Sequence, residues 1–278
     1  MIKIFRIIVV VCFLVVSVFF ATTYIEEYRA MDNTLPVITV KEDKLELSVN
    51  DGEEKLLEGI TAFDEKDGDI TDKVIVESVS KFIKPGVCKV KYAVCDSNNH
   101  VANATRKVVY TDYKAPKFTL NKSICFSLYQ SIDVKSAIGA TDCFDGSLDS
   151  NIIITSPDFK SAAEGVYTIE ASVTNSKGDV AKLKLPLIVE NRSLSAPVIE
   201  LRKYLVYLEK GEEFDLEKNL LKITDHKGEK VKATPEIDTN LNFQKDGTYT
   251  VHYYATDSEG YKGHSVMTVI VGSGNNEG

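Results

Sequence analysis

Three aspartates around a glycine are the residues of this sequence most able to bind a metal ion. Asp64, Asp67 and Asp69 surround Gly68. Carboxylate oxygens are the hard ligands that Ca²⁺ prefers, so these residues are a candidate calcium site, with calcium the candidate cofactor. The segment is not an EF-hand, because the twelfth position counted from Asp64 is Ile75 and not a glutamate. The alternative is an Asp-rich turn whose carboxylates accept hydrogen bonds from backbone N–H groups.

The five cysteines show no C-x-x-C spacing of the kind that marks a zinc or redox site. Cys88 and Cys95 are seven residues apart on one expected strand, so their side chains point to opposite faces and cannot bridge. Cys125 and Cys143 are the candidate disulfide, provided that they meet across one domain in an oxidising compartment. The alternative is two free thiols, since free cysteine is an ordinary buried residue.

No combination of residues predicts an active site. The histidines are expected at turns and at outward strand positions, without a zinc pair among them: His100, His226, His252 and His264. No glycine-rich phosphate loop is present, and no histidine stands near a serine in a nucleophile elbow. With 41 acidic residues, paired carboxylates arise by chance. The sequence therefore predicts a protein that is not an enzyme.

Four tyrosines near the C-terminal end are candidates for a binding surface: Tyr204, Tyr207, Tyr254 and Tyr261. Gathered on one face, they would form an aromatic patch that binds a glycan or a protein. The alternative is that some belong to a core and the others are separate surface aromatics, which are ordinary in sheets. A net charge of -8 leaves no basic face for phosphates, so a nucleic-acid partner is not expected.

The elements that would hold these residues repeat three times along the chain. A proline opens a short alternating strand at residues 36–40, 116–120 and 197–201. A glycine opens a longer alternating strand at residues 86–94, 165–173 and 247–255. A closing strand is expected at residues 105–111, 183–189 and 266–271. Alternation with period two is typical of strands with one buried and one wet face, and units of about 80 residues with such strands predict β-sandwiches. Only residues 214–222 suggest a helical turn.

At these positions the sequence resembles the bacterial Ig-like repeat of the pesticidal-crystal-protein type, which occurs in tandem in Gram-positive surface proteins. The first repeat carries the motif most fully: Asp64, the run 67–71, Gly86, Val90, Tyr92, Val94 and Asp96, with Cys88 where tyrosine is usual. The second repeat keeps Asp142, Asp145, Gly146, Gly165, Tyr167 and Ile169. The third keeps Gly247, Tyr249, Val251, Tyr253 and Asp257, but its acidic loop is reduced to residues 225–229. The resemblance implies surface display, a stalk or adhesion role, and no enzymatic activity.

The expected architecture is all-β, with three tandem immunoglobulin-like β-sandwiches after one N-terminal transmembrane helix. The expected segments are an anchor or signal segment at 1–25, a linker at 26–35, Ig-like domains at 36–112, 116–190 and 197–272, and a polar tail at 273–278. The linkers between the domains are short and end at a proline, which favours a semi-rigid string of beads.

The N-terminal segment sets the expected location. Lys3 and Arg6 precede an uncharged run at residues 7–25, and Glu26 and Glu27 follow it. At about 1.5 Å per residue this run spans a bilayer core as a helix. By the positive-inside rule the N-terminus is cytoplasmic and the C-terminal domains are extracellular, in a single-pass protein of the cell membrane. The alternative is a cleaved signal peptide and a secreted protein, although Phe19 and Phe20 make a poor cleavage site.

The sequence thus predicts a non-enzymatic, membrane-anchored bacterial surface protein whose Ig-like rod acts as a stalk, adhesin or protein-interaction module. Its expected partners are the membrane, through the N-terminal helix, and a surface protein or glycan. The alternative function is a carbohydrate-binding accessory module that serves a surface enzyme or envelope complex. A coplanar row of aromatic side chains on the third repeat would favour this alternative.

Overall fold

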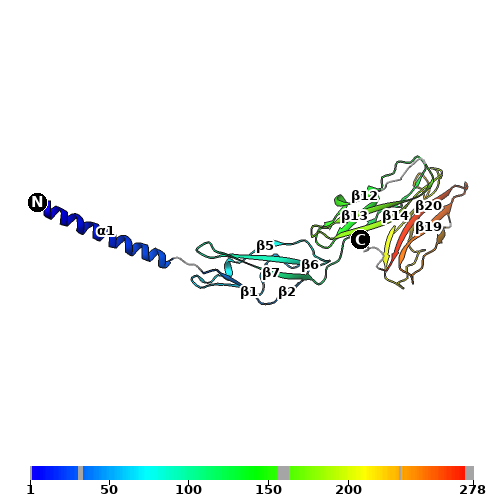
Figure 1. Cartoon of the computed structure of the whole chain (residues 1–278). Helices are drawn as coiled ribbons and strands as arrows, with labels where there is room; N and C mark the ends of the chain where they lie inside the picture. The colour runs from blue at the N-terminus through cyan, green and yellow to red at the C-terminus, as the bar shows by residue number, and fades with distance from the viewer. Residues whose placement is uncertain (1, 31–33, 156–162, 232, 234, 273–278) are drawn as a thin grey trace. The chain divides into compact units, whose positions relative to one another are not determined.

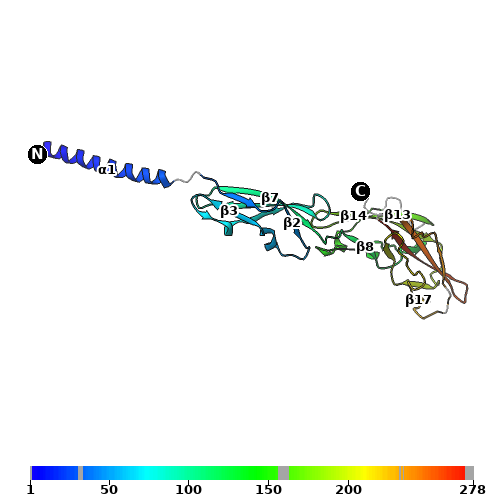
Figure 2. The same cartoon turned by 90° about the horizontal axis from the view of Figure 1, so that it is seen from below.

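The structure is a computed structural model that describes residues 2–30, 34–155, 163–231, 233 and 235–272. The predicted tail, 273–278, and residues 31–33 of the predicted linker lie outside these ranges. Within them, one helix precedes six β-sheets (Figure 1; Figure 2). The chain divides into two compact units, residues 1–80 with 88–109 and residues 81–87 with 110–278.

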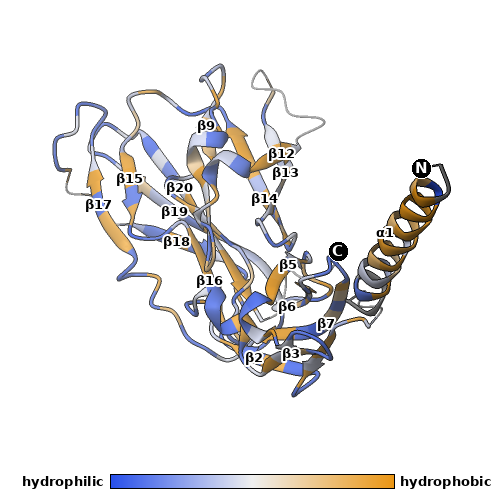
Figure 3. Cartoon of the chain, turned by 90° about the vertical axis from the view of Figure 1, so that its left-hand side faces the viewer, coloured by the Kyte–Doolittle hydropathy of each residue, from blue (hydrophilic) through white to orange (hydrophobic). Residues whose placement is uncertain are grey.

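Helix α1 (Ile2–Ala30) is coloured as hydrophobic along most of its length (Figure 3). The segment of residues 4–26 is long enough and apolar enough to cross a membrane, judged by its length and composition. The helix continues past the predicted anchor, 1–25, into the predicted linker, 26–35. Residues 26–30 include no glycine or proline, so nothing breaks the helix where its apolar run ends.

The first sandwich is formed by two sheets in the first unit. One sheet has the order β1-β3-β4, with bounds β1 (Val37–Val40), β3 (Ile60–Asp64) and β4 (Gly68–Asp69). The other has the order β2-β7-β6-β5, with bounds β2 (Lys44–Leu47), β5 (Ile75–Val79), β6 (Val87–Cys95) and β7 (Val101–Tyr110). Short 3₁₀ turns at residues 53–57 and 71–73 join strands of the two sheets.

The second sandwich repeats this plan in the second unit. One sheet has the order β11-β10-β8, with bounds β8 (Lys117–Leu120), β10 (Ile138–Asp142) and β11 (Gly146–Ser147). The other has the order β12-β13-β14-β9, with bounds β9 (Cys125–Ser127), β12 (Ile153–Thr155), β13 (Gly165–Thr174) and β14 (Val180–Glu190). Figure 2 shows β13 beside β14, and β9 runs parallel to the end of β14. Residues 135–137 and 149–151 form 3₁₀ turns.

The third sandwich follows the same topology. One sheet pairs β15 (Val198–Leu201) with β17 (Leu220–Thr224). The other has the order β16-β20-β19-β18, with bounds β16 (Leu205–Leu208), β18 (Glu236–Thr239), β19 (Gly247–Thr256) and β20 (Lys262–Val271). The helical turn suggested at residues 214–222 is not formed, since residues 216–219 are a non-helical turn that leads directly into β17.

The predicted inward phase of the long strands is the buried one. In β6 the inward residues Cys88, Val90, Tyr92 and Val94 are all buried, and the equivalent apolar positions in β13 and β19 also face the core. The buried apolar residues of the second and third sandwiches form one continuous cluster. These two sandwiches therefore share a core. They are not independent domains joined only by a linker, because apolar side chains are buried where they meet.

The core of the first sandwich contains a buried cation. Arg106 on β7 is 3 % exposed, and its guanidinium donates to the carbonyl oxygens of Leu56 and Glu58, each at 2.7 Å. It also donates to the hydroxyl of Tyr92, which itself donates to the Leu56 carbonyl at 2.7 Å. Every bond is charge-assisted or buried, so this network stabilises the sandwich only as long as all its members are present.

Candidate functional site

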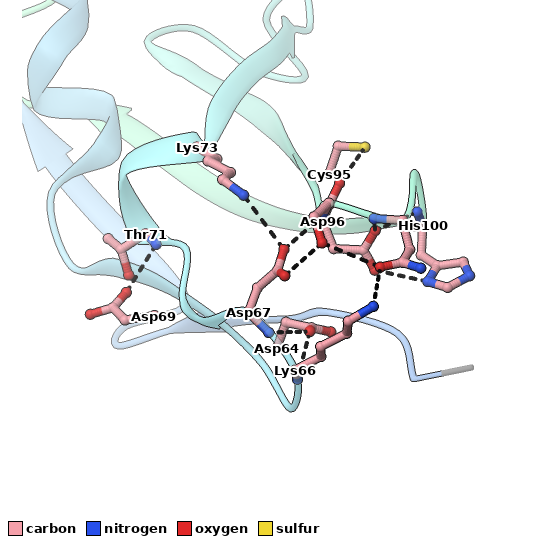
Figure 4. A network of polar contacts seen from close by, with 11 residues as sticks. Asp64, Lys66, Asp67, Asp69, Thr71, Lys73, Cys95, Asp96 and His100 are labelled. Carbon is pink, nitrogen blue, oxygen red and sulfur yellow. Dashed lines mark hydrogen bonds and ion pairs between the residues drawn. The ribbon is translucent and has the colours of Figure 1, made fainter. Parts of the chain in front are cut away.

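The predicted calcium residues lie on the hairpin of β3 and β4: Asp64 ends β3, Asp67 is in the turn and Asp69 is on β4 (Figure 4). Asp64, at the end of β3, is 1 % exposed, and its Oδ1 accepts the backbone N–H groups of Lys66 and Asp67, both at 2.9 Å. Its Oδ2 is buried and has no hydrogen-bond partner among the described residues. Asp64 thus shapes the turn with one oxygen and leaves the other unpaired.

Asp67 and Asp69 point to different partners. Asp67 accepts the backbone N–H of Ser97 at 2.6 Å and its hydroxyl at 2.7 Å, and Lys73 lies 3.5 Å away. Asp69 accepts the backbone N–H of Thr71 at 3.0 Å. The hydrogen bonds from Ser97 lower the pKa of Asp67, and those from Thr71 lower the pKa of Asp69. Both carboxylates are therefore used as charged acceptors by the neighbouring loops.

A fourth carboxylate completes this network. Asp96, at the end of β6, accepts the backbone N–H groups of Asn98 and His100 at 2.8 Å, and His100 Nδ1 lies 2.8 Å from its second oxygen. Burial acts to raise the pKa of Asp96, but the hydrogen bonds from His100 and Asn98 outweigh it, and the pKa is lowered. The sequence placed Asp96 in a turn but gave no sign of its pairing with His100, because that contact depends on the turn geometry.

The carboxylates predicted to bind calcium do not converge on a common point among the described residues. The second sandwich supports the turn interpretation, because its loop repeats the same bonds. Asp142 accepts the backbone N–H groups of Phe144 and Asp145, and Asp145 accepts the N–H of Ser176. There, Asn175 donates to the second oxygen of Asp142 at 3.1 Å. Calcium binding in the first sandwich remains a prediction.

The predicted disulfide is not formed. Cys125 and Cys143 are both free, the first buried and the second exposed. Cys125 on β9 faces β20, with its Sγ 3.3 Å from Nδ1 of His264. Cys143 lies in the turn after β10, where its thiol donates to the carbonyl of Lys114 at 3.2 Å. The prediction is wrong because β9 turns its cysteine toward the third sandwich and not across the second.

The four tyrosines occupy separate environments. Tyr204 is buried, and its hydroxyl accepts the backbone N–H of Leu201. Tyr207 is half-buried with the Lys117 ammonium 5.5 Å from its ring centroid. Tyr254 and the exposed Tyr261 line a shared cavity of about 300 Å³. Tyr204 and Tyr207 each line a different cavity, so these side chains do not form a single coplanar row.

The histidine prediction also needs correction, because two histidines meet on the third sandwich. Nδ1 of His252 on β19 lies 3.0 Å from Nε2 of His264 on β20. His264 is buried, and its Nδ1 lies 2.8 Å from a carboxylate oxygen of Glu190 at the end of β14. Together with Cys125, these side chains form a partly buried polar cluster that sequence reasoning missed. Cys125 and Glu190 are far from His264 in the chain, so no local spacing could have revealed those contacts, whereas His252 and His264 are 12 residues apart on the hairpin of β19 and β20.

Comparisons with known proteins agree with this fold. The model of the family described as "Bacterial surface protein, Ig-like domain" matches residues 38–109 and 203–271, together about half of the chain. An "Uncharacterized 81.3 kDa protein" of Acholeplasma phage L2 is 29% identical over 139 residues, which are 49% of this chain and 19% of that protein. The chain thus spans about a fifth of the length of this relative.

The similarity to solved structures is weaker. A structure of the CBM51-2 and INT domains of Clostridium perfringens ZmpB, in complex with GlcNAc, is 20% identical, covers 50% of this chain and 28% of its own, and has a TM-score of 0.24. Drosophila N-cadherin EC1-3 is 12% identical, covers 84% of this chain and 98% of its own, and has a TM-score of 0.33. On the strength of the two matched segments and the sandwiches that they form, the chain belongs to the bacterial surface proteins with Ig-like domains.

Proposed function

We propose that this chain is a non-enzymatic module tethered to the membrane of a bacterium, with its N-terminus in the cytoplasm and its Ig-like domains outside. The domains span residues 36–112, 116–190 and 197–272, are of the pesticidal-crystal-protein type, and act as a stalk that presents a surface to a partner protein. The order of the elements carries this proposal: the uncharged run 7–25 of α1, with Lys3 and Arg6 before it and Glu26 after it, is followed by sandwiches of a surface family.

A protein is a better partner for this stalk than a glycan. A carbohydrate-binding module of this kind would present aromatic rings in one row, and the tyrosines of the third sandwich are distributed over separate cavities. The outward face of the first sandwich instead carries an apolar pair. Val37 and Phe63 lie directly opposite each other on β1 and β3, and both are more than half exposed. Exposed aromatic and aliphatic side chains of this kind are common at protein interfaces.

Protease treatment of intact cells that produce the full chain tests the proposed location. We expect fragments of the three domains in the released fraction, while the peptide with residues 1–25 stays with the membrane. The matched control is a variant with Val10→Arg and Val15→Arg, which places two charges in the helix and should abolish membrane retention. If the chain is cleaved only after the cells are lysed, the proposed topology is wrong. If the mature protein begins after residue 21 and is found in the medium, the secreted alternative is correct.

A further inference from the structure

We propose that Cys125, Glu190 and His264 form a binding site for a divalent transition metal ion, with Zn²⁺ as the best match. The three side chains are the sulfur, oxygen and imidazole ligands that zinc takes in proteins. Their ligand atoms all lie within 4.8 Å of one another. Cys125 is on β9 and Glu190 ends β14, whereas His264 is on β20 of the neighbouring sandwich. A bound ion would therefore join the second and third sandwiches through their side chains.

The distances between the ligand atoms fit a tetrahedral ion with little movement. Zinc bonds of about 2.3 Å to sulfur and about 2.0–2.2 Å to nitrogen or oxygen place neighbouring ligand atoms about 3.3–3.6 Å apart. Sγ of Cys125 lies 3.3 Å from Nδ1 of His264 and 3.5 Å from one oxygen of Glu190. The other oxygen of Glu190 lies 2.8 Å from Nδ1 of His264. This last pair must separate by about 0.5 Å to admit the ion.

Neighbouring groups hold the three ligands in place. The ring of Tyr254 stacks on His264, with centroids 4.4 Å apart. Arg192 donates to the backbone carbonyl of His264 and lies 3.4 Å from one oxygen of Glu190, so the other oxygen is available to an ion. The hydroxyl of Ser123 accepts the backbone N–H of Val266 at 2.9 Å, which fixes β20 beside the segment before β9. The ligands are thus set on strands whose relation is fixed by other bonds, as a binding site requires.

His252 positions the imidazole of His264 for metal binding. If Nδ1 of His264 binds the ion, the ring proton is on Nε2, and Nδ1 of His252 is at 3.0 Å to accept it. The two imidazoles also stack, with ring centroids 5.2 Å apart, so His252 is held beside Nε2 of His264. A histidine ligand is commonly oriented through its other nitrogen in this way, and loss of such a partner lowers metal affinity about 10–100-fold. His252 is a positioning residue and not a ligand.

Solvent reaches the cluster, so a fourth ligand is supplied by water. One cavity of about 430 Å³ is lined by Cys125 and His264, and a second of about 300 Å³ is lined by Glu190 and His264. Binding displaces the proton of the Cys125 thiol to solvent, and the metal–sulfur bond forms with the thiolate.

Titration of the metal-free full chain in detergent with Zn²⁺, and with Co²⁺ as a spectroscopic probe, tests this proposal. We expect one equivalent to bind saturably and Co²⁺ to give a thiolate-to-metal absorption band. Cys125→Ser should abolish the band and weaken Zn²⁺ binding more than 100-fold, and His252→Phe should weaken it about 10-fold with the band retained. Cys143→Ser, which removes an exposed thiol outside the cluster, is the matched control and should change neither.

Two results would overturn the site. The first is no saturable binding of either ion to the wild-type chain. The second is binding that persists with the same affinity and the same band in Cys125→Ser. Glu190→Gln keeps the size of the side chain and removes its charge, so it separates ligand loss from misfolding if Cys125→Ser is unstable. The surface location can fail while the metal binds, and metal binding can fail in a correctly displayed protein, so the two proposals are tested separately.

Discussion

The first and third sandwiches bury the same tyrosine but surround it with different chemistry. Tyr92 and Tyr253 each stand six residues after the glycine that opens the long strand, and they donate to the carbonyls of Leu56 and Leu216 at 2.7 and 2.9 Å. Ten residues after the aspartate that ends this strand, the first sandwich has Arg106 and the third has Met267. A cation in one core thus takes the place of a thioether in the other.

The difference shows how one fold satisfies its buried carbonyls in two ways. In the first sandwich Arg106 donates to two carbonyl oxygens and to the Tyr92 hydroxyl. In the third, Asn219 supplies the donor, to the carbonyl of Lys203 at 2.9 Å and to the sulfur of Met267 at 3.0 Å. A buried charge is tolerated when all its protons have acceptors, and a neutral amide serves when fewer acceptors need to be satisfied.

Arg106→Ala should produce the largest difference in stability between the cores of the first and third sandwiches. We expect it to lower the free energy of local unfolding of the first sandwich by about 3 kcal/mol, because it leaves buried carbonyls unpaired and opens a cavity. Arg106→Met, which copies the third sandwich, should cost about half as much, since it fills the space. Hydrogen exchange of β6 and β7 peptides in the full chain measures both, with β19 and β20 as the internal control. Equal damage from the two variants would contradict this account of the buried cation.

One position beside the acidic loops differs between the first and second sandwiches, with Asp96 in the first and Asn175 in the second, and these two residues can be exchanged. Asn175→Asp should lower the stability of the second sandwich by about 2 kcal/mol, because an aspartate cannot donate to Asp142 and adds a like charge 3.1 Å away. Asp96→Asn makes the reverse change in the first sandwich and removes the negative charge that lies 2.8 Å from His100, so it should also lower the stability of that sandwich, by less than Asn175→Asp lowers that of the second. Hydrogen exchange around residues 64–73 and 142–151 measures the two changes. An unchanged first sandwich in Asp96→Asn would show that the charge of Asp96 does not stabilise its turn.

Removal of the buried tyrosine hydroxyl should produce a smaller difference in stability between the first and third sandwiches. Tyr92→Phe removes a hydroxyl bonded to a charged guanidinium and should cost about 2 kcal/mol, whereas Tyr253→Phe removes neutral bonds and should cost about 1 kcal/mol. Denaturant-dependent hydrogen exchange of β6 and β19 peptides measures each loss in its own sandwich. The comparison fails if Tyr253→Phe is the more damaging of the two.

A fall in pH should produce the smallest difference in stability between the first and second sandwiches. The pKa values of Asp67, Asp69 and Asp96 are lowered in the folded chain, so their contribution is complete above their ordinary value of 3.8 and is lost as the pH falls through the folded values. The second sandwich has Ser147 and Asn175 in place of Asp69 and Asp96 and lacks those two titrating groups. Protection factors of the first loop should therefore fall below about pH 4 before those of the second. Identical acid profiles would contradict the assigned role of these carboxylates.

The long strands could be predicted from the sequence because their signal is local. The expected strand at 165–173 became β13 (Gly165–Thr174), and the one at 247–255 became β19 (Gly247–Thr256). The closing strands begin three or four residues earlier than predicted, for example β14 at Val180 instead of Leu183. Pairing with the preceding long strand extends them into polar residues, whose alternation alone is a weak signal.

The contacts of the candidate sites could not be predicted in the same way. Glu190 and His264 are 74 residues apart, and Cys125 and His264 are 139 apart, so only the packing of two sandwiches brings them together. The same holds for the buried Arg106, which an alternating pattern would place on a wet face or exclude from a core. The alternation of apolar residues and the residues of the turns predict the strands. Which side chains meet in the core depends on how the strands pair and how the sheets pack.

Labelling of native cysteines tests most directly the claim that the sandwiches are displayed outside the membrane. Cys95 and Cys143 are exposed on the first and second sandwiches, whereas Cys88 and Cys125 are buried and Cys12 lies within α1. A membrane-impermeant maleimide applied to intact cells should label the wild-type chain, and the variant with Cys95→Ser and Cys143→Ser should stay unlabelled. Labelling of the wild type only after the membrane is permeabilised would contradict the account.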